Sequence, residues 1–116
     1  MNLKNFIFEH FKNVVVFDFE FSQPPGENPK PVCCTFKELK SGDQFTHWYL
    51  DQQHDWPFED KDTLYICHMA AAEVSCMLEL GLDIPSHVWD TFVQDMKLHR
   101  GKENKFGLLP CCNRYG

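Results

Sequence analysis

VVVFDFEF, residues 14–21, is an apolar run that two carboxylates interrupt. It is rich in β-branched and aromatic residues, it is short for a helix, and Pro24-Pro25-Gly26 follows it, so we predict a strand. Successive side chains on a strand point to opposite faces. The packed face would then hold Val15, Phe17, Phe19 and Phe21, and the other face Val14, Val16, Asp18 and Glu20.

The two acids on that second face, Asp18 and Glu20, carry charges that something must offset. Their Cα atoms would lie about 7 Å apart, two strand rises, so both carboxylates can reach one divalent cation. Without a cation, their mutual repulsion and any burial would be unfavourable. The alternative is an exposed strand end at which both acids are solvated, and so short a motif does not exclude it.

The composition indicates one small globular domain over residues 1–116. Hydrophobic residues make up 43% of the chain and charged residues 24%, with eleven phenylalanines available for a core. No apolar run reaches the length of a transmembrane helix, and Glu9, His10 and Lys12 stand where a signal peptide would be apolar. We therefore expect a cytoplasmic protein with no membrane partner.

Cysteine spacing and charge restrict the chemistry further. The six cysteines include two vicinal pairs but no C-x-x-C spacing, which disfavours a zinc or redox centre, and we expect all six to be reduced. The net charge of −6 argues mildly against a nucleic-acid partner. On composition alone, the stretch near the C-terminus is most simply interpreted as a solvated loop. Its basic residues are nevertheless clustered: Lys97, His99, Arg100, Lys102, Lys105 and Arg114.

Strands precede helices along the rest of the chain. The runs at 32–39 and 44–50 flank the turn residues 40–43 and predict an antiparallel hairpin, after an exposed loop at 24–31. A fourth strand is predicted over 63–67. Helical spacing from Ala70 to Leu80, with Gly81 at its end, predicts a helix. Residues 88–98 suggest a fifth strand that turns into a helix, with Asp90 as its N-cap.

A further acid, Glu73, falls in the first turn of the helix predicted from Ala70. The three alanines before it leave room for something bulky to approach. A glutamate at this position also complements the helix dipole without any chemistry, and taken alone that structural interpretation would be preferred.

Taken together, the D-x-E of the first strand, the hairpin and the acid that opens a helix after a later strand resemble the DEDD family of 3′–5′ exonucleases, whose fold is RNase H-like. The similarity extends over about residues 14–115. It is greatest to the N-terminal proofreading-type domain of phage and mobile-element family A DNA polymerases, where DFEF, PPGENPKPVC, ELKSG and an AE…LELG…P…V.D block occur in this order.

The resemblance implies an α/β fold with a mixed sheet, in which a three-stranded antiparallel part is followed by strand-helix units. It also implies two-metal phosphodiester hydrolysis with Mg²⁺ or Mn²⁺. Asp18, Glu20 and Glu73 would be the catalytic and metal-binding acids. His68, five residues before Glu73, would either bind and orient the substrate or cap the strand end.

The sequence departs from the family pattern in three places. The acid of the second motif is usually Asp and is here Glu73, and the residue five before it is commonly Asn and is here His68. The third motif, a Tyr or His followed by a final Asp on a later helix, is absent, because Asp90 and Asp95 come too early and LLPCCNRYG resembles the helix before it. We therefore expect a partial exonuclease domain that lacks the C-terminal part of the fold.

Two functions are consistent with these observations. The first is the metal-dependent 3′–5′ exonuclease domain of a phage-like DNA polymerase, acting on a single-stranded DNA or RNA 3′ end in the host cytoplasm and completed by the remainder of the polymerase or by a partner. The second is a non-catalytic module that binds nucleic acid or protein on a degenerate RNase H-like fold. Apolar surface left uncovered by the missing helix would favour self-association.

Overall fold

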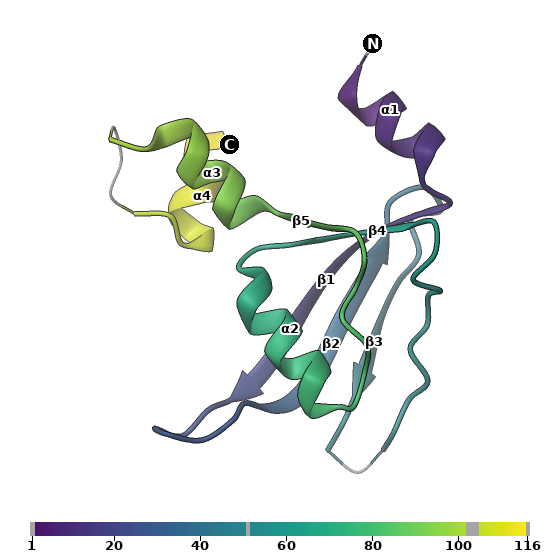
Figure 1. Ribbon diagram of the computed structural model, residues 1–116, viewed down its shortest axis with the longest axis vertical. Coiled ribbons are helices and arrows are strands. Elements are labelled where there is room, and N and C mark those ends of the chain that lie inside the picture. Colours follow the sequence, from purple (N-terminus) through teal and green to yellow (C-terminus); the bar gives the residue numbers. More distant parts are fainter. Residues whose placement is uncertain (1, 51, 102–104, 116) are drawn as a thin grey trace.

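A computed structural model describes residues 2–50, 52–101 and 105–115. Five strands form one mixed sheet in the order β3-β2-β1-β4-β5 (Figure 1). Strands β1, β2 and β3 pair antiparallel, whereas β4 runs parallel to β1 and β5 parallel to β4. The elements are α1 (Leu3–His10), β1 (Asn13–Ser22), β2 (Lys30–Glu38), β3 (Gln44–Trp48), β4 (Thr63–Cys67), α2 (Ala70–Glu79), β5 (Val88–Asp90), α3 (Thr91–His99) and α4 (Leu108–Tyr115). The predicted mixed α/β, RNase H-like sheet is confirmed.

Strand β1 is the centre of the sheet and alternates as predicted over most of its length. Phe17 and Phe19 are buried, whereas Asp18 and Glu20 between and beside them are exposed. Val14 lies on the same face as Val16 and Asp18, as predicted, but it is fully buried there. The reason is helix α1, which the sequence pattern did not predict. It lies beside Val14, and the side chains of Leu3, Ile7 and Phe8 line the same groove.

The hairpin of β2 and β3 confirms the predicted turn, with changed ends. Strand β2 begins at Lys30, inside the stretch expected to be loop, and β3 ends at Trp48. Glu38 closes the hairpin, because its carboxylate accepts hydrogen bonds from the amides of Val14 at 2.9 Å and Ser41 at 2.8 Å. Burial alone would raise the pKa of Glu38, but these amides hold it below its usual value.

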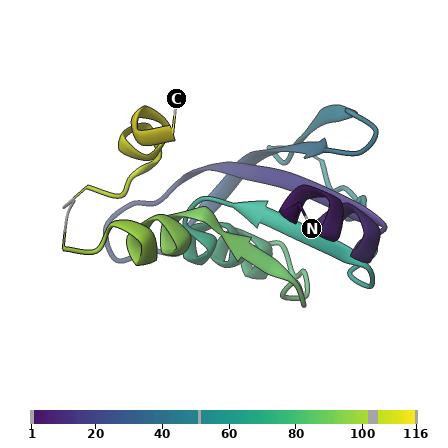
Figure 2. The ribbon, with the colours of Figure 1, turned by 90° about the horizontal axis from the view of Figure 1, so that it is seen from above.

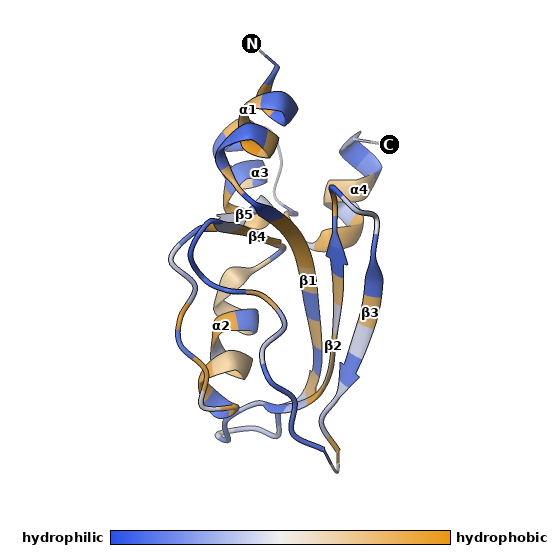
Figure 3. Cartoon of the chain, turned by 90° about the vertical axis from the view of Figure 1, so that its right-hand side faces the viewer, coloured by the Kyte–Doolittle hydropathy of each residue, from blue (hydrophilic) through white to orange (hydrophobic). Residues whose placement is uncertain are grey.

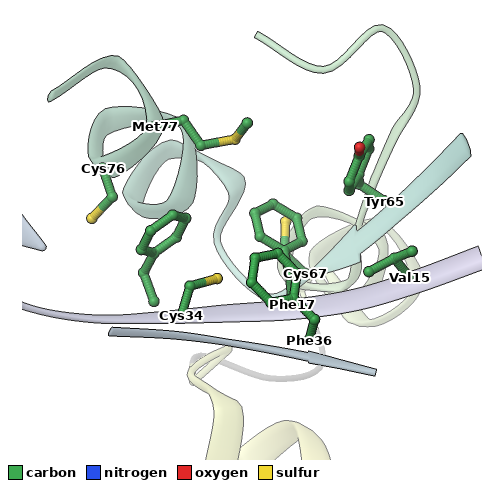
Figure 4. Close-up of a cluster of buried hydrophobic side chains, with 9 residues drawn as sticks. Val15, Phe17, Cys34, Phe36, Tyr65, Cys67, Cys76 and Met77 are labelled. Atoms are coloured by element: carbon green, nitrogen blue, oxygen red, sulfur yellow. The ribbon is translucent and has the colours of Figure 1, made fainter. Parts of the chain in front are cut away.

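One face of the sheet carries the core. Phe17 and Phe36 from the sheet pack with Met77 from α2, and Cys34, Cys67 and Cys76 fill the space around them (Figure 4). The segment between β3 and β4 covers the remainder of this face without regular structure, and its Trp56 contacts the rings of Phe17, Phe19 and Phe36. All six cysteines are unpaired, as expected for reduced thiols.

The opposite face of the sheet is more open. Helix α2 lies on the core side, whereas α4 lies on the other side of the sheet (Figures 2 and 3). Asp18 and Val16 on this open face line a shallow groove with Thr35 and Lys37 of β2. None of the helices in the described ranges is long and apolar enough to cross a membrane.

Candidate functional site

Asp18 and Glu20 lie side by side on the open face of β1, as predicted. They pair across the sheet with Thr35 and Cys33 of β2. Partial burial raises the pKa of Asp18, and the neighbouring Glu20 carboxylate raises it further. The two acids therefore repel each other in the metal-free protein, which is the arrangement that a bound cation would relieve.

The backbone changes register next to this pair. Glu20 pairs with Cys33 but Phe21 pairs with Pro31, so the two strands slip by one residue between them. A proline has no amide hydrogen to donate to a ladder and is tolerated in strands at such irregularities. The slip falls directly after the D-x-E sequence and changes the course of the strand there.

Glu73 is buried where β1 extends beyond β4. The parallel pairing of β1 with β4 ends at Val16 and Ile66, so the amide of Phe19 has no strand partner on that side. Glu73 supplies the acceptor from the first turn of α2, at 3.3 Å between Phe19 N and Oε1. Its other oxygen, Oε2, is buried without a hydrogen-bond partner, and the side chain is 3% exposed.

Burial raises the pKa of Glu73 far above that of an ordinary glutamate. Removal from water raises its pKa to about 7, with Asp18 and Asp90 adding repulsion and the Phe19 amide opposing the shift. A buried carboxyl group with a pKa near neutrality and an unpartnered oxygen is typical of functional sites more than of structural helix ends. These features make Glu73 a candidate for a chemical role in addition to the dipole interaction.

Helix α2 depends on Asp90 for its start. The residue at its N-cap, Met69, has a left-handed backbone with φ of 68° and provides no side-chain cap. The Asp90 carboxylate takes over, accepting from Met69 N at 3.0 Å and Ala70 N at 2.8 Å, and it also accepts from Phe92 N of α3 at 2.9 Å. The predicted N-cap is thus confirmed, and it serves two helices.

His68 joins the end of β4 to the segment that precedes α4. Its Nδ1 lies 2.8 Å from Thr91 Oγ1 and its Nε2 lies 2.9 Å from the carbonyl oxygen of Phe106. Both ring nitrogens therefore have protein partners. This geometry agrees with the interpretation of His68 as a cap of the strand end. The two hydrogen bonds also hold the segment around Phe106 against the end of β4.

The basic C-terminal stretch is more ordered than a solvated loop. Asp95 is buried and accepts from His99 Nδ1 at 3.0 Å and from Arg114 Nε at 3.1 Å, while a second nitrogen of Arg114 pairs with its other oxygen. This cluster fastens α4 to α3. The hydrogen bonds and charge of Arg114, with a smaller contribution from His99, hold the pKa of Asp95 below its usual value. Lys102, which we placed in the same basic stretch, lies outside the described residues.

The acid pair has the donor atoms that a divalent ion requires. Asp18 and Glu20 offer adjacent carboxylate oxygens, the donors that Mg²⁺ prefers, and one or two carboxylates are the usual protein share of its shell. Among residues 2–50, 52–101 and 105–115, no three His, Cys, Asp or Glu side chains gather closely enough to enclose an ion. The pair therefore fits an ion that keeps much of its water, with Glu73 outside the immediate pair.

Solved structures with this fold include nucleases. The chain is similar to a protein described as the apo form of the nuclease, with a TM-score of 0.64 and 14% identity over 93% of this chain and 53% of the other. It is also similar to the Aedes aegypti Nibbler EXO domain, with a TM-score of 0.56 and 11% identity over 89% of this chain and 55% of the other. It shares the fold of nucleases.

Similarity to these two structures is limited to the fold and to part of their length. The chain spans about half the length of each. No protein-family model matches it, and no curated protein sequence matches it. The assignment of particular side chains to chemistry therefore depends on the geometry of the site itself.

Proposed function

We propose that this chain is the exonuclease-type domain of a longer, polymerase-like protein and takes part in divalent-metal-dependent 3′–5′ hydrolysis of phosphodiester bonds. The observation that carries the proposal is the adjacent Asp18 and Glu20 pair on the open face of β1, in a fold that nucleases share. We propose that a strand of nucleic acid reaches the two acids from that face.

Asp18 and Glu20 would hold Mg²⁺ or Mn²⁺. The ion would supply an activated water and charge stabilisation for the departing 3′ oxygen. Glu73 would bind a second ion through water, with Oε2 as the oxygen that is still without a partner. Because the pKa of Glu73 is about 7, its carboxyl group can also accept or release a proton near neutral pH. His68 would help to position the substrate by holding the segment around Phe106.

Completion of the site is part of the proposal. The third motif of the resembling family has no counterpart in residues 1–116, and the chain spans about half of each similar structure. We propose that the missing Tyr or His and the final Asp come from further polymerase sequence or from a partner chain. Carboxylates of one metal site act as a unit, so the loss of one member removes most of the activity.

The test is a trimming assay with Mn²⁺ and a 5′-labelled single strand. Residues 1–116 alone should show little or no exonuclease activity. Adding the family's missing segment, in the same chain or in trans, should restore it, and an Asp18→Asn variant of the restored protein should be inactive. Strong trimming by residues 1–116 that disappears in Asp18→Asn would show that no third motif is required. A restored protein that never trims would contradict the proposed function.

The second candidate function is a non-catalytic module that binds nucleic acid or protein. It is favoured by the bond from the Phe19 amide to Glu73, which turns that acid into a structural acceptor between α2 and β1. Metal titration separates the two candidates. If the site is that of an exonuclease, the heat of Mn²⁺ binding should disappear in an Asp18→Ala, Glu20→Ala double variant. If the acids have no metal-binding role, the wild type and the double variant should give the same heat of titration.

A further inference from the structure

A groove of about 400 Å³ lies at the end of the domain, outside the acid pair. One wall is a stripe of α3 at helical spacing, and the other is Phe106 in the segment before α4. Its lining residues are Val93, Met96, Lys97, Arg100, Gly101 and Phe106. Val93 and Met96 are 43% and 39% exposed, which leaves an apolar floor open to solvent on a helix.

The charged side chains that line this groove in the described part of the chain are both cations. Lys97 and Arg100 are exposed. Among residues 2–50, 52–101 and 105–115, no carboxylate lines the groove and neither cation takes part in an ion pair. The nearest acid on the same helix, Asp95, is buried and already paired with Arg114 and His99. In a chain of net charge −6, these two side chains are a local concentration of positive charge.

Apolar and cationic surfaces combined in one groove match the chemistry of an unpaired nucleotide. A base stacks on an aromatic or apolar side chain whatever its sequence, and the adjacent phosphates take the cations. Phe106 is the aromatic side chain that lines the groove, and the Arg114 guanidinium lies over its ring, 5.4 Å from the centroid. A base would stack on the other face of the ring. A double helix keeps its bases stacked on one another and offers no such face.

The groove is joined to the candidate site by His68. The carbonyl oxygen of Phe106 contacts His68 Nε2 at 2.9 Å, and His68 lies five residues before Glu73 on the strand-to-helix connection. The Phe92 ring lies edge-on to His68, with 5.6 Å between centroids, so the base of α3 belongs to the same cluster. The groove therefore belongs to the same set of contacts as the connection that leads to Glu73.

We propose that the groove between α3 and Phe106 is a binding subsite for single-stranded nucleic acid, with bases on Phe106 and Met96 and phosphates on Lys97 and Arg100. The identity of the polyanion rests on the proposed function, whereas the groove and its charges do not. The subsite would retain the strand away from the acids, so binding there requires neither the metal nor the missing third motif.

The experiment measures binding by fluorescence anisotropy with a labelled 15-nucleotide oligo-dT, in EDTA, over a range of salt concentrations. A Lys97→Gln, Arg100→Gln variant should bind more weakly, and the slope of log affinity against log salt should fall by about 1.4, because each phosphate contact on a single strand contributes about 0.7. The matched control is Lys12→Gln, Lys61→Gln, which removes the same charge from exposed positions elsewhere. A control that loses as much affinity as the groove variant would overturn the proposal.

The aromatic contact is tested at Phe106. Phe106→Leu keeps the backbone carbonyl that contacts His68 but removes the stacking face, and affinity should fall roughly 5- to 100-fold. Phe106→Trp restores an aromatic face and should restore binding, which separates stacking from a folding defect. Unchanged binding in Phe106→Leu, or equal competition by a blunt duplex, would refute the stacking role.

A final comparison separates this subsite from the proposed chemistry. An Asp18→Asn, Glu20→Gln variant should bind the oligonucleotide in EDTA no more weakly than the wild type, because the subsite does not use those acids and the substitutions remove negative charge. Binding that depends on the groove, in a completed protein that never trims, would sustain the subsite and contradict the proposed function. A completed protein that trims, but whose groove variants bind the oligonucleotide normally, would support the proposed function and contradict the subsite.

Discussion

Replacing Glu73 by Gln should stabilise the metal-free protein above neutral pH and leave it almost unchanged at pH 4. The carboxyl group is 3% exposed and its pKa is raised from 4.5 to about 7, chiefly by burial. The folded protein therefore binds this proton more tightly than the unfolded chain. Its contribution to stability is complete below the unfolded pKa and is lost as pH rises through the folded pKa.

The size of the effect depends on those two pKa values. A difference of one pH unit corresponds to about 1.4 kcal/mol, so the range from 4.5 to about 7 sets an upper value of about 3 kcal/mol. Gln is nearly the same size, keeps an oxygen for the Phe19 amide and has no charge to desolvate. The variant should therefore become the more stable protein between pH 4.5 and about 7, and remain so at pH 8.

Urea unfolding monitored by circular dichroism, repeated from pH 4 to pH 8.5 in EDTA, measures this difference. Glu79→Gln is the matched control, since Glu79 is exposed on the same helix, and it should change stability by less than about 0.5 kcal/mol. Parallel pH profiles for the wild type and Glu73→Gln, or a variant that is less stable at pH 8, would show that Glu73 is not a buried charge.

Three further changes test other parts of the fold and the site. Phe19→Ala should lower the free energy of unfolding by about 3–5 kcal/mol, because it leaves a cavity between Tyr49 and Trp56. Glu20→Gln, on the open face, should leave the metal-free protein unchanged or slightly more stable. Melting curves in the reverse order would overturn the assignment of strand faces. Mn²⁺ should bind weakly, and calorimetry should show that binding disappears in Asp18→Ala, Glu20→Ala. Asp90→Ala should cost about 1–4 kcal/mol in urea unfolding because two helix starts lose their acceptor, and a loss below about 0.5 kcal/mol would contradict that role.

Periodicity in the sequence was sufficient for the elements that pack against the core. The alternation of Phe17 and Phe19 with Asp18 and Glu20 predicted both faces of β1, and the helix from Ala70 ends close to where Gly81 adopts a φ of 73°. These patterns are local consequences of having one buried face, so they are readable before the fold is known.

Other features depend on contacts between distant parts of the chain. The burial of Val14 requires helix α1, and the bond to Glu73 requires that β4 end before β1 does. The segment carrying Trp56 has no regular period, yet it supplies core contacts that a strand or helix pattern does not reveal. For the same reason, the sequence predicted Arg114 to be solvated although it pairs with Asp95.

The position of Asp90 has a mechanical consequence. One carboxylate is bonded to amides at the starts of both α2 and α3, so neither helix can turn about its first residue without loosening the other. Movement of α3, which carries Lys97 and Arg100, should therefore be coupled to movement of the first turn of α2, which carries Glu73. If a strand binds at the proposed groove, a pull on α3 would be transmitted to the start of α2 through the three hydrogen bonds of Asp90.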